Sequence, residues 1–200
     1  MTRTRPFGRL DDGTPVHAWR LGDADGLSAE ILDLGGILAR LEFPGAHGRT
    51  GVVLGLDDAH AYQHDPAYLG ILVGRFGNRI GDAAYTLDGR RHPLAANEGP
   101  NHLHGGVRGF GGRLWTVDAH DADRLALRYR SPDGEEGYPG NLDVTATYRL
   151  QGPRLCLDFE ASCDAPTPFN PTHHPYFNLA GDPSGPGSAQ WLQGPAGGYL

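Results

Sequence analysis

The sequence contains no lysine: all 17 of its basic residues are arginine, against 24 acidic residues. Without lysine, no Schiff base can form on a lysine amine, and the lysine of a phosphate-binding loop is missing. The net charge is -7, and the arginines form no obvious cluster. Because binding of phosphate backbones requires a basic face, we expect no nucleic-acid partner.

Cysteine and long apolar runs are also scarce. The two cysteines, Cys156 and Cys163, are too few for a disulfide scaffold. The first lies in an alternating strand pattern and the second just past its end, so we expect unpaired thiols, buried or half-buried. Residues 1–12 are polar rather than a signal peptide, and no apolar stretch approaches the length of a membrane span. We therefore expect a cytoplasmic protein without a membrane partner.

Glycine and proline are abundant instead, with 31 and 16 residues, and favour many short strands joined by turns. Apolar and polar residues alternate with period two in three late segments, which predicts strands half-buried on one face. An Asp-Gly pair at 88–89 predicts a hairpin between flanking strands. The expected strands are 29–34, 37–43, 52–56, 85–87, 90–94, 114–117, 124–130, 142–150 and 154–161. Segment 57–68 is the best candidate for a helix or loop, broken by Pro66. The pattern predicts an antiparallel all-β sandwich, with residues 1–200 as one domain.

Two arginines and an asparagine share the glycine-spaced segment 74–81: Arg75, Asn78 and Arg79. An arginine fork and an amide can bind several sugar hydroxyls at once. The alternative is a strand end with solvated arginines. The segment does not have the order of a dinucleotide fingerprint.

His102 and His104 lie two positions apart in the glycine-rich segment 97–112. In an extended chain both would share one face. They could bind a metal, contact a ligand hydroxyl, or cap backbone groups. A metal site needs a third and usually a fourth ligand, so we expect no metal here.

Segment 168–179 combines His173 and His174 with an amide, two aromatic residues and stiffening prolines. Rigid loops suit catalysis because they hold reacting groups in place. The alternative is an aromatic core with a buried histidine. Segment 131–141 carries three carboxylates, but its glycines and prolines favour a structured turn over acid–base chemistry.

Four segments, "GRFGNRIG", "NHLHGG", "SPDGEEGYPGNL" and "NPTHHPYFNLAG", resemble the motifs of aldose 1-epimerases in order and spacing. The resemblance runs from about residue 7 to 180. It implies an antiparallel β-supersandwich with a sugar in an open cleft, and neither cofactor nor metal. It assigns sugar binding to Asn78, Arg79 and His104, and the role of general acid to His174. The sequence departs from the family pattern at His173 and Pro175, which affects the geometry of that loop.

Mutarotation needs an acid and a base on opposite sides of the sugar C1 atom. Histidine, with an ordinary pKa of about 6.5, can be the acid near neutral pH. The family's base is a glutamate near its C-terminus, and we expect it to be absent from a chain ending at Leu200. The sandwich is then incomplete, and we expect poor solubility, or a monomer with weak self-association.

The sequence therefore predicts an aldose 1-epimerase that interconverts the anomers of free hexoses such as galactose and glucose. The alternative is a non-catalytic carbohydrate-binding or vestigial fragment that lacks the glutamate. A hexose-phosphate mutarotase ranks below both, because such a site needs further arginines directed at the phosphate.

Overall fold

A computed structural model describes residues 3–23, 25–45, 48–181, 190–191 and 193–194. Most of the glycine- and proline-rich segment 181–200 lies outside these residues. The helices of the described part are too short to cross a membrane.

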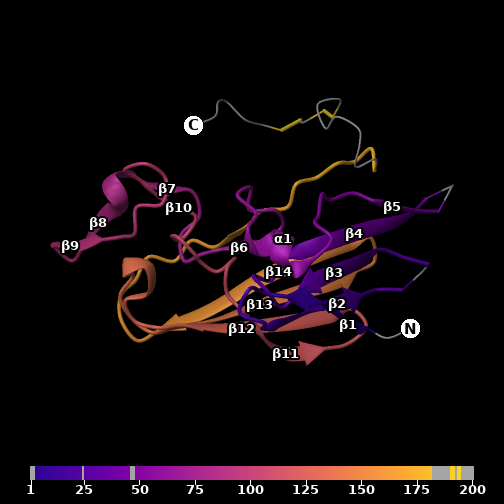
Figure 1. Cartoon of the computed structure of the whole chain (residues 1–200), viewed down its shortest axis with the longest axis horizontal. Coiled ribbons are helices and arrows are strands. Elements are labelled where there is room, and N and C mark those ends of the chain that lie inside the picture. Colours follow the sequence, from indigo (N-terminus) through magenta and orange to yellow (C-terminus); the bar gives the residue numbers. More distant parts are fainter. Residues whose placement is uncertain (1–2, 24, 46–47, 182–189, 192, 195–200) are drawn as a thin grey trace.

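Two antiparallel sheets form the body of the molecule and stack on each other (Figure 1). The first contains five strands in chain order: β1 (Thr4–Arg9), β2 (Pro15–Leu21), β3 (Ser28–Leu32), β4 (Leu38–Gly45) and β5 (Gly48–Gly51). The second contains four: β11 (Thr116–His120), β12 (Arg124–Ser131), β13 (Leu142–Gln151) and β14 (Arg154–Cys163). The expected antiparallel all-β sandwich is confirmed.

The main core lies between the two sheets, because alternate residues of each strand point to the same side. Ile31 and Leu38 of the first sheet belong to one cluster with Leu127, Val144 and Tyr148 of the second. A smaller cluster on the opposite face of the first sheet is covered by helix α1 (Ala59–Gln63), through Ala59 and Tyr62. The first sheet therefore buries side chains on both faces.

Three short strand pairs lie between or beside the sheets. β6 (Leu72–Val73) pairs with β15 (Thr172–His173), and β7 (Arg79–Ile80) pairs with β10 (His102–Leu103). The hairpin of β8 (Ala84–Leu87) and β9 (Arg90–Pro93) confirms the prediction from the Asp-Gly turn. In Figure 1, β7 to β10 extend from one end of the sandwich, together with the short helix η1 (Gly81–Ala83). A second short helix, η2 (Glu135–Gly137), lies in the β12–β13 connection.

Several predicted boundaries are wrong. Residues 52–56 are not a strand, because only Val53 forms a bridge, to Phe177, and the segment then leaves the sheet. Segment 57–68, expected to be a helix or loop broken by Pro66, contains the short helix α1, which Asp58 caps at its start and which ends at Gln63. The strand expected to reach Leu34 stops at Leu32, and the one expected at 114–117 begins at Thr116 and extends to His120.

The predictions for the late strands are confirmed, each within two residues at its ends. Both cysteines are free and half-buried, as expected. Cys163, however, is the last residue of β14 rather than beyond it, because its partner Leu142 extends the ladder that far.

Candidate functional site

The rings of His104 and His174 meet edge to face, with centroids 5.2 Å apart. Tyr68 lies against both, with ring centroids 5.1 Å from His104 and 6.1 Å from His174. Tyr176 follows on the other side, 5.3 Å from His174. Both histidines are half-buried, so each ring is partly shielded and partly open to solvent. This histidine pair with its two tyrosines is the centre of the candidate site.

Short strands fix the two histidines. His104 follows β10, and its backbone N–H donates to the Asn78 carbonyl, at 3.2 Å. His174 follows β15, where its N–H donates to the Ile71 carbonyl and its own carbonyl accepts from Gly70. The β6–β15 and β7–β10 pairs therefore bring together residues that are distant in the sequence.

The protonation state of His104 follows from its contacts. The backbone N–H of Asn78 donates to His104 Nδ1 at 3.0 Å, so this nitrogen is an acceptor and the ring proton lies on Nε2. Burial lowers the pKa of His104, and the nearby His174 and Arg79 lower it further. A neutral imidazole with an Nε2–H donor results, which suits a sugar hydroxyl.

Arg79 and Asn78 are exposed beside this pair. The Arg79 guanidinium donates from Nε and Nη2 to one oxygen of Glu98, at 3.2 and 2.8 Å. The same ion pair raises the pKa of Arg79 and lowers that of Glu98. Glu98 also accepts from Asn101, so the carboxylate fixes the arginine from a second loop. Sequence reasoning did not identify Glu98, although it precedes the Leu-His-Gly-Gly motif by only a few residues.

Arg75 does not belong to the site. Its side chain is 2% exposed, because the guanidinium is enclosed by the β12–β13 connection. The six hydrogen bonds of its guanidinium go to Ser131 Oγ, Thr167 Oγ1 and the carbonyls of Ser131, Pro132, Pro139 and Gly140. Arg75 is therefore neither a sugar-binding fork nor the solvated arginine of the alternative for segment 74–81.

His102 and His104 do not share a face. The expectation that an extended chain places both rings on one side is therefore wrong here. His104 has a backbone φ of 52°, which ends the extended conformation and turns its ring away from that of His102. His102 is fully buried, contacting the Ala95 carbonyl at 2.7 Å and Tyr138 Oη at 2.8 Å. The paired-histidine metal site therefore has no geometric basis.

The two adjacent histidines of the third segment also have different environments. His173 Nε2 lies 3.2 Å from the Gly70 carbonyl and 3.3 Å from Tyr148 Oη. Its burial lowers its pKa to about 4. The expectation of a core histidine thus holds for His173, while His174 faces the site.

The carboxylates of segment 131–141 accept hydrogen bonds and an ion pair from neighbouring segments, which is consistent with the expected structured turn. Glu136 accepts from the backbone N–H groups of Val107, Arg108 and Gly109, at 2.9, 3.0 and 3.4 Å. Glu135 is the acceptor of an ion pair from Arg113 at 2.8 Å. These carboxylates hold the loop that follows His104 rather than facing the two histidines.

The glycines after His104 are required by the packing. Gly105 has a φ of 85°, and a Cβ atom there would lie 1.7 Å from the Gly74 carbonyl oxygen. A Cβ on Gly106 would lie 2.2 Å from Glu136 Oε2. The Leu-His-Gly-Gly motif therefore combines one ring directed to the site with two positions that tolerate no side chain.

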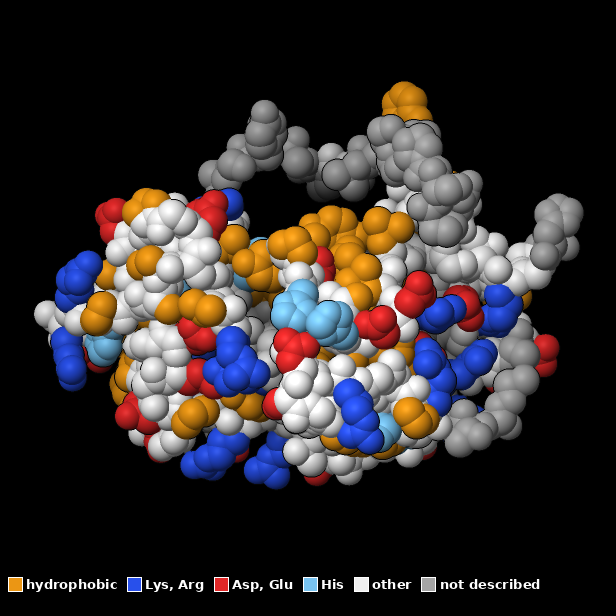
Figure 2. Space-filling view, viewed as in Figure 1, with side chains coloured by type: hydrophobic (Ala, Val, Ile, Leu, Met, Phe, Trp, Pro, Cys, Tyr) orange, Lys and Arg blue, Asp and Glu red, His pale blue; other side chains and the backbone are white. Residues whose placement is uncertain are grey.

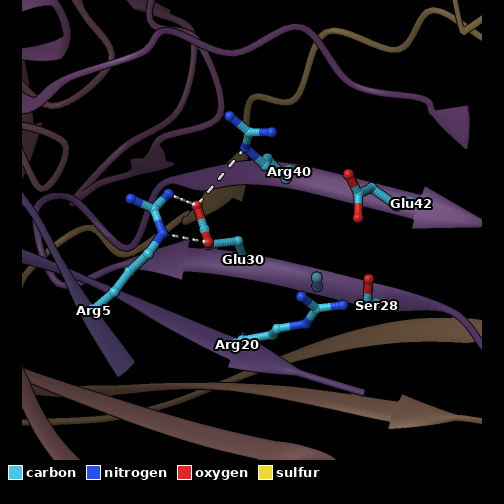
Figure 3. A pocket seen from close by; sticks show the side chains of 7 residues that line it. Arg5, Arg20, Ser28, Glu30, Arg40 and Glu42 are labelled. Atoms are coloured by element: carbon cyan, nitrogen blue, oxygen red, sulfur yellow. Dashed lines mark hydrogen bonds and ion pairs between the residues drawn. The ribbon is translucent and has the colours of Figure 1, made fainter. Parts of the chain in front are cut away.

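A separate hollow of about 370 Å³ lies on the face of the first sheet that points away from the second sheet (Figure 3). Its charged side chains largely pair with one another: Arg5 and Arg40 both contact Glu30. None of the motif residues lines it, so we do not assign it to the candidate site.

Comparison with known proteins identifies the family to which the chain belongs. The family profile described as aldose 1-epimerase matches residues 17–194. The galactose mutarotases of Sus scrofa and Homo sapiens are 43% and 41% identical over 180 residues, which is 89% of this chain and 52% of theirs. The aldose 1-epimerase of Escherichia coli is 36% identical over 175 residues, 86% of this chain and 51% of its own.

Solved structures give the same result. The GalM/aldose epimerase homologue from C. elegans superposes with a TM-score of 0.78 at 34% identity, covering 82% of this chain and 51% of that one. The galactose 1-epimerase of Lactobacillus acidophilus gives 0.77 at 30% identity, covering 88% and 52%. The chain spans about half the length of these relatives, and the fold is the β-supersandwich that the resemblance implied. The chain belongs to the aldose 1-epimerase family.

Proposed function

We propose that this chain carries the sugar-binding face and the general acid of an aldose 1-epimerase, acting on free hexoses such as galactose or glucose. The observation that carries the proposal is the contact between the His104 and His174 rings, beside the exposed Arg79–Asn78 pair. His174 is the group that protonates the ring oxygen. His104, Arg79 and Asn78 bind hydroxyls and orient C1.

The chemistry accounts for these assignments. Ring opening removes the C1 hydroxyl proton and delivers a proton to the ring oxygen; rotation about C1–C2 and closure on the other face give the second anomer. The neutral His104 donates from Nε2, and Arg79 offers further N–H donors. His174 makes no side-chain hydrogen bond in the described part of the chain, so its ring nitrogens are available to substrate.

A second function, sugar binding without catalysis, is favoured by one observation. Among the described residues, no carboxylate forms a hydrogen bond or ion pair with His104 or His174. These contacts therefore identify no carboxylate as the base on the opposite side of C1. Loss of one acid or base partner costs roughly 10²–10⁴-fold in rate.

Polarimetry distinguishes the two functions. Freshly dissolved α-D-galactose and α-D-glucose are followed with the full chain, with His174→Ala and with His64→Ala, an exposed histidine that is not among the proposed sugar ligands. Acceleration over buffer that His174→Ala abolishes and His64→Ala preserves supports the epimerase. No acceleration, with saturable galactose binding weakened by Arg79→Met, supports the binding function.

Phosphorylated sugars remain the third alternative. Arg75 is enclosed by carbonyls, which removes one of the two arginines in the motifs from phosphate recognition. Stronger competition by galactose 1-phosphate or glucose 6-phosphate than by the free sugars would support that alternative instead.

A further inference from the structure

Two histidines and an aspartate form a cluster: His60 lies in α1, His64 is the residue that caps its C-terminus, and Asp11 lies in the β1–β2 turn. His60 Nδ1 lies 2.9 Å from Asp11 Oδ1, and His64 Nε2 lies 2.9 Å from Asp11 Oδ2. The two imidazole rings have centroids 4.7 Å apart. One ligand atom from each residue lies within 4.8 Å of the other two. In Figure 2 pale-blue histidine atoms adjoin red carboxylate atoms where Figure 1 shows α1.

The backbone holds these three side chains in position. His60 and His64 are four residues apart, so they lie on the same face of the helical turn. The helix is anchored by the buried Ala59 and Tyr62. Asp11 is fixed from the other side, because its backbone N–H donates to Gln63 Oε1 at 2.9 Å. The cluster therefore joins two segments whose separation is already set.

The three groups are chemically suited to a metal. All three side chains are about half exposed or more, so a hydrated ion can reach them. Asp11 and His64 also line a hollow of about 440 Å³, which leaves room for water ligands. Each imidazole now lies against a carboxylate oxygen, and a cation can replace the shared proton.

We propose that His60, His64 and Asp11 bind a divalent transition-metal ion such as Zn²⁺, through two imidazole nitrogens and one carboxylate oxygen. Water completes the tetrahedral coordination, because three protein ligands leave one position open. Imidazole ligands favour Zn²⁺, Cu²⁺ or Ni²⁺, whereas Mg²⁺ and Ca²⁺ prefer sites made wholly of oxygen. Since the ligands come from two segments, the ion would fasten the β1–β2 turn to α1.

Sequence reasoning considered a metal only at His102 and His104 and did not consider residues 60 and 64. The pair at 60 and 64 has the spacing of two ligands on one helical turn. The third ligand, however, comes from a turn nearly fifty residues earlier, and only the packing of α1 on the first sheet brings it there. The three proposed ligands are not among the proposed sugar ligands, although Tyr68 of the candidate site lines the same hollow as Asp11 and His64. The metal proposal does not rest on the proposed function.

Calorimetric titration of the metal-free full chain with ZnCl₂ tests the site. We expect one equivalent to bind, and each of His60→Ala, His64→Ala and Asp11→Asn to weaken binding at least tenfold. The thermal midpoint of the wild-type chain rises with Zn²⁺, and that of the variants does not. Magnesium chloride gives neither effect.

The matched control is His104→Ala/His174→Ala, which removes the other close pair of histidines. Binding unchanged in this control supports the proposal, while binding lost in it and retained in His64→Ala overturns it. Absence of saturable zinc binding also overturns it. Should a variant fail to fold, Cu²⁺ electron paramagnetic resonance of the wild-type chain decides: coupling to two nitrogens is expected, and coupling to none refutes the site.

Discussion

The ring of His104 lies edge to face on the ring of His174, at an interplanar angle of 77°. Each ring projects from the end of a different two-stranded ladder, β7–β10 for His104 and β6–β15 for His174. Neither ladder is long enough to be stable alone. The site therefore forms only when both ladders pack on the sandwich, and stability of the fold and geometry of the site are linked.

Arg75→Met and Arg79→Met should separate stability from sugar binding. Arg75→Met leaves several buried carbonyls without a donor, so we expect the free energy of unfolding to fall by more than about 3 kcal/mol. Arg79 is exposed, and Arg79→Met should leave stability nearly unchanged while weakening sugar binding. Chemical denaturation and galactose titration measure the two effects. An equal fall in the free energy of unfolding in both variants would contradict the conclusion that Arg75 stabilises the fold and Arg79 does not.

Gly105→Ala should be much more damaging than Gly134→Ala. Both glycines have positive φ, 85° and 80°, so both substitutions incur the backbone penalty of about 1–2 kcal/mol. Only Gly105 also faces the Gly74 carbonyl; a Cβ on Gly134 would meet nothing within 4 Å. We expect the free energies of unfolding of the two variants, measured by thermal unfolding, to differ by more than about 2 kcal/mol. Similar melting curves would show that the loop relaxes around the added methyl group.

Stability should fall in acid because of His173. Its folded pKa of about 4 lies below its ordinary value of 6.5, so the unfolded state binds the proton more readily. The stabilisation is present above pH 6.5 and is lost as the pH falls toward 4, by up to about 3 kcal/mol. Denaturant titrations across this range measure it. In His173→Gln the slope should flatten, and an unchanged slope would rule out this histidine as its source.

Glu98→Gln should weaken sugar binding without destabilising the fold. The carboxylate fixes the exposed Arg79 guanidinium, so its loss lets the arginine sample other rotamers. We expect a rise in the dissociation constant of roughly two- to fivefold, smaller at high salt because the pair is exposed. Glu160→Gln is the control, because this exposed residue of β14 forms no ion pair in the described part of the chain. Tighter or unchanged binding in Glu98→Gln would show that Glu98 does not position Arg79.

Local pattern was sufficient for three of the four strands of the second sheet, β12, β13 and β14. In β12, β13 and β14 apolar residues alternate with charged ones, and consecutive antiparallel strands pair over nearly their full length. Such ladders depend on neighbours in the sequence, so period two predicts both their extent and their face. Residues 52–56 have an equally apolar pattern, but their partner is Phe177, a residue more than a hundred positions away. No local signal could show that the pairing there is a single bridge.

The functional residues also divide into those that the sequence identified and those that only the tertiary structure distinguished. The motifs determined, from the sequence alone, which family the chain resembles and that Asn78, Arg79, His104 and His174 are the candidates for a sugar site. Tertiary structure alone decided that Arg75 and His173 are enclosed by the protein, whereas Arg79 is exposed and His174 packs against His104, and that Asp11 meets His60 and His64. Neighbours in a motif have the same chemistry, so composition cannot distinguish them. Burial does, because an enclosed guanidinium or imidazole must satisfy its hydrogen bonds within the protein, whereas an exposed one is available to a ligand.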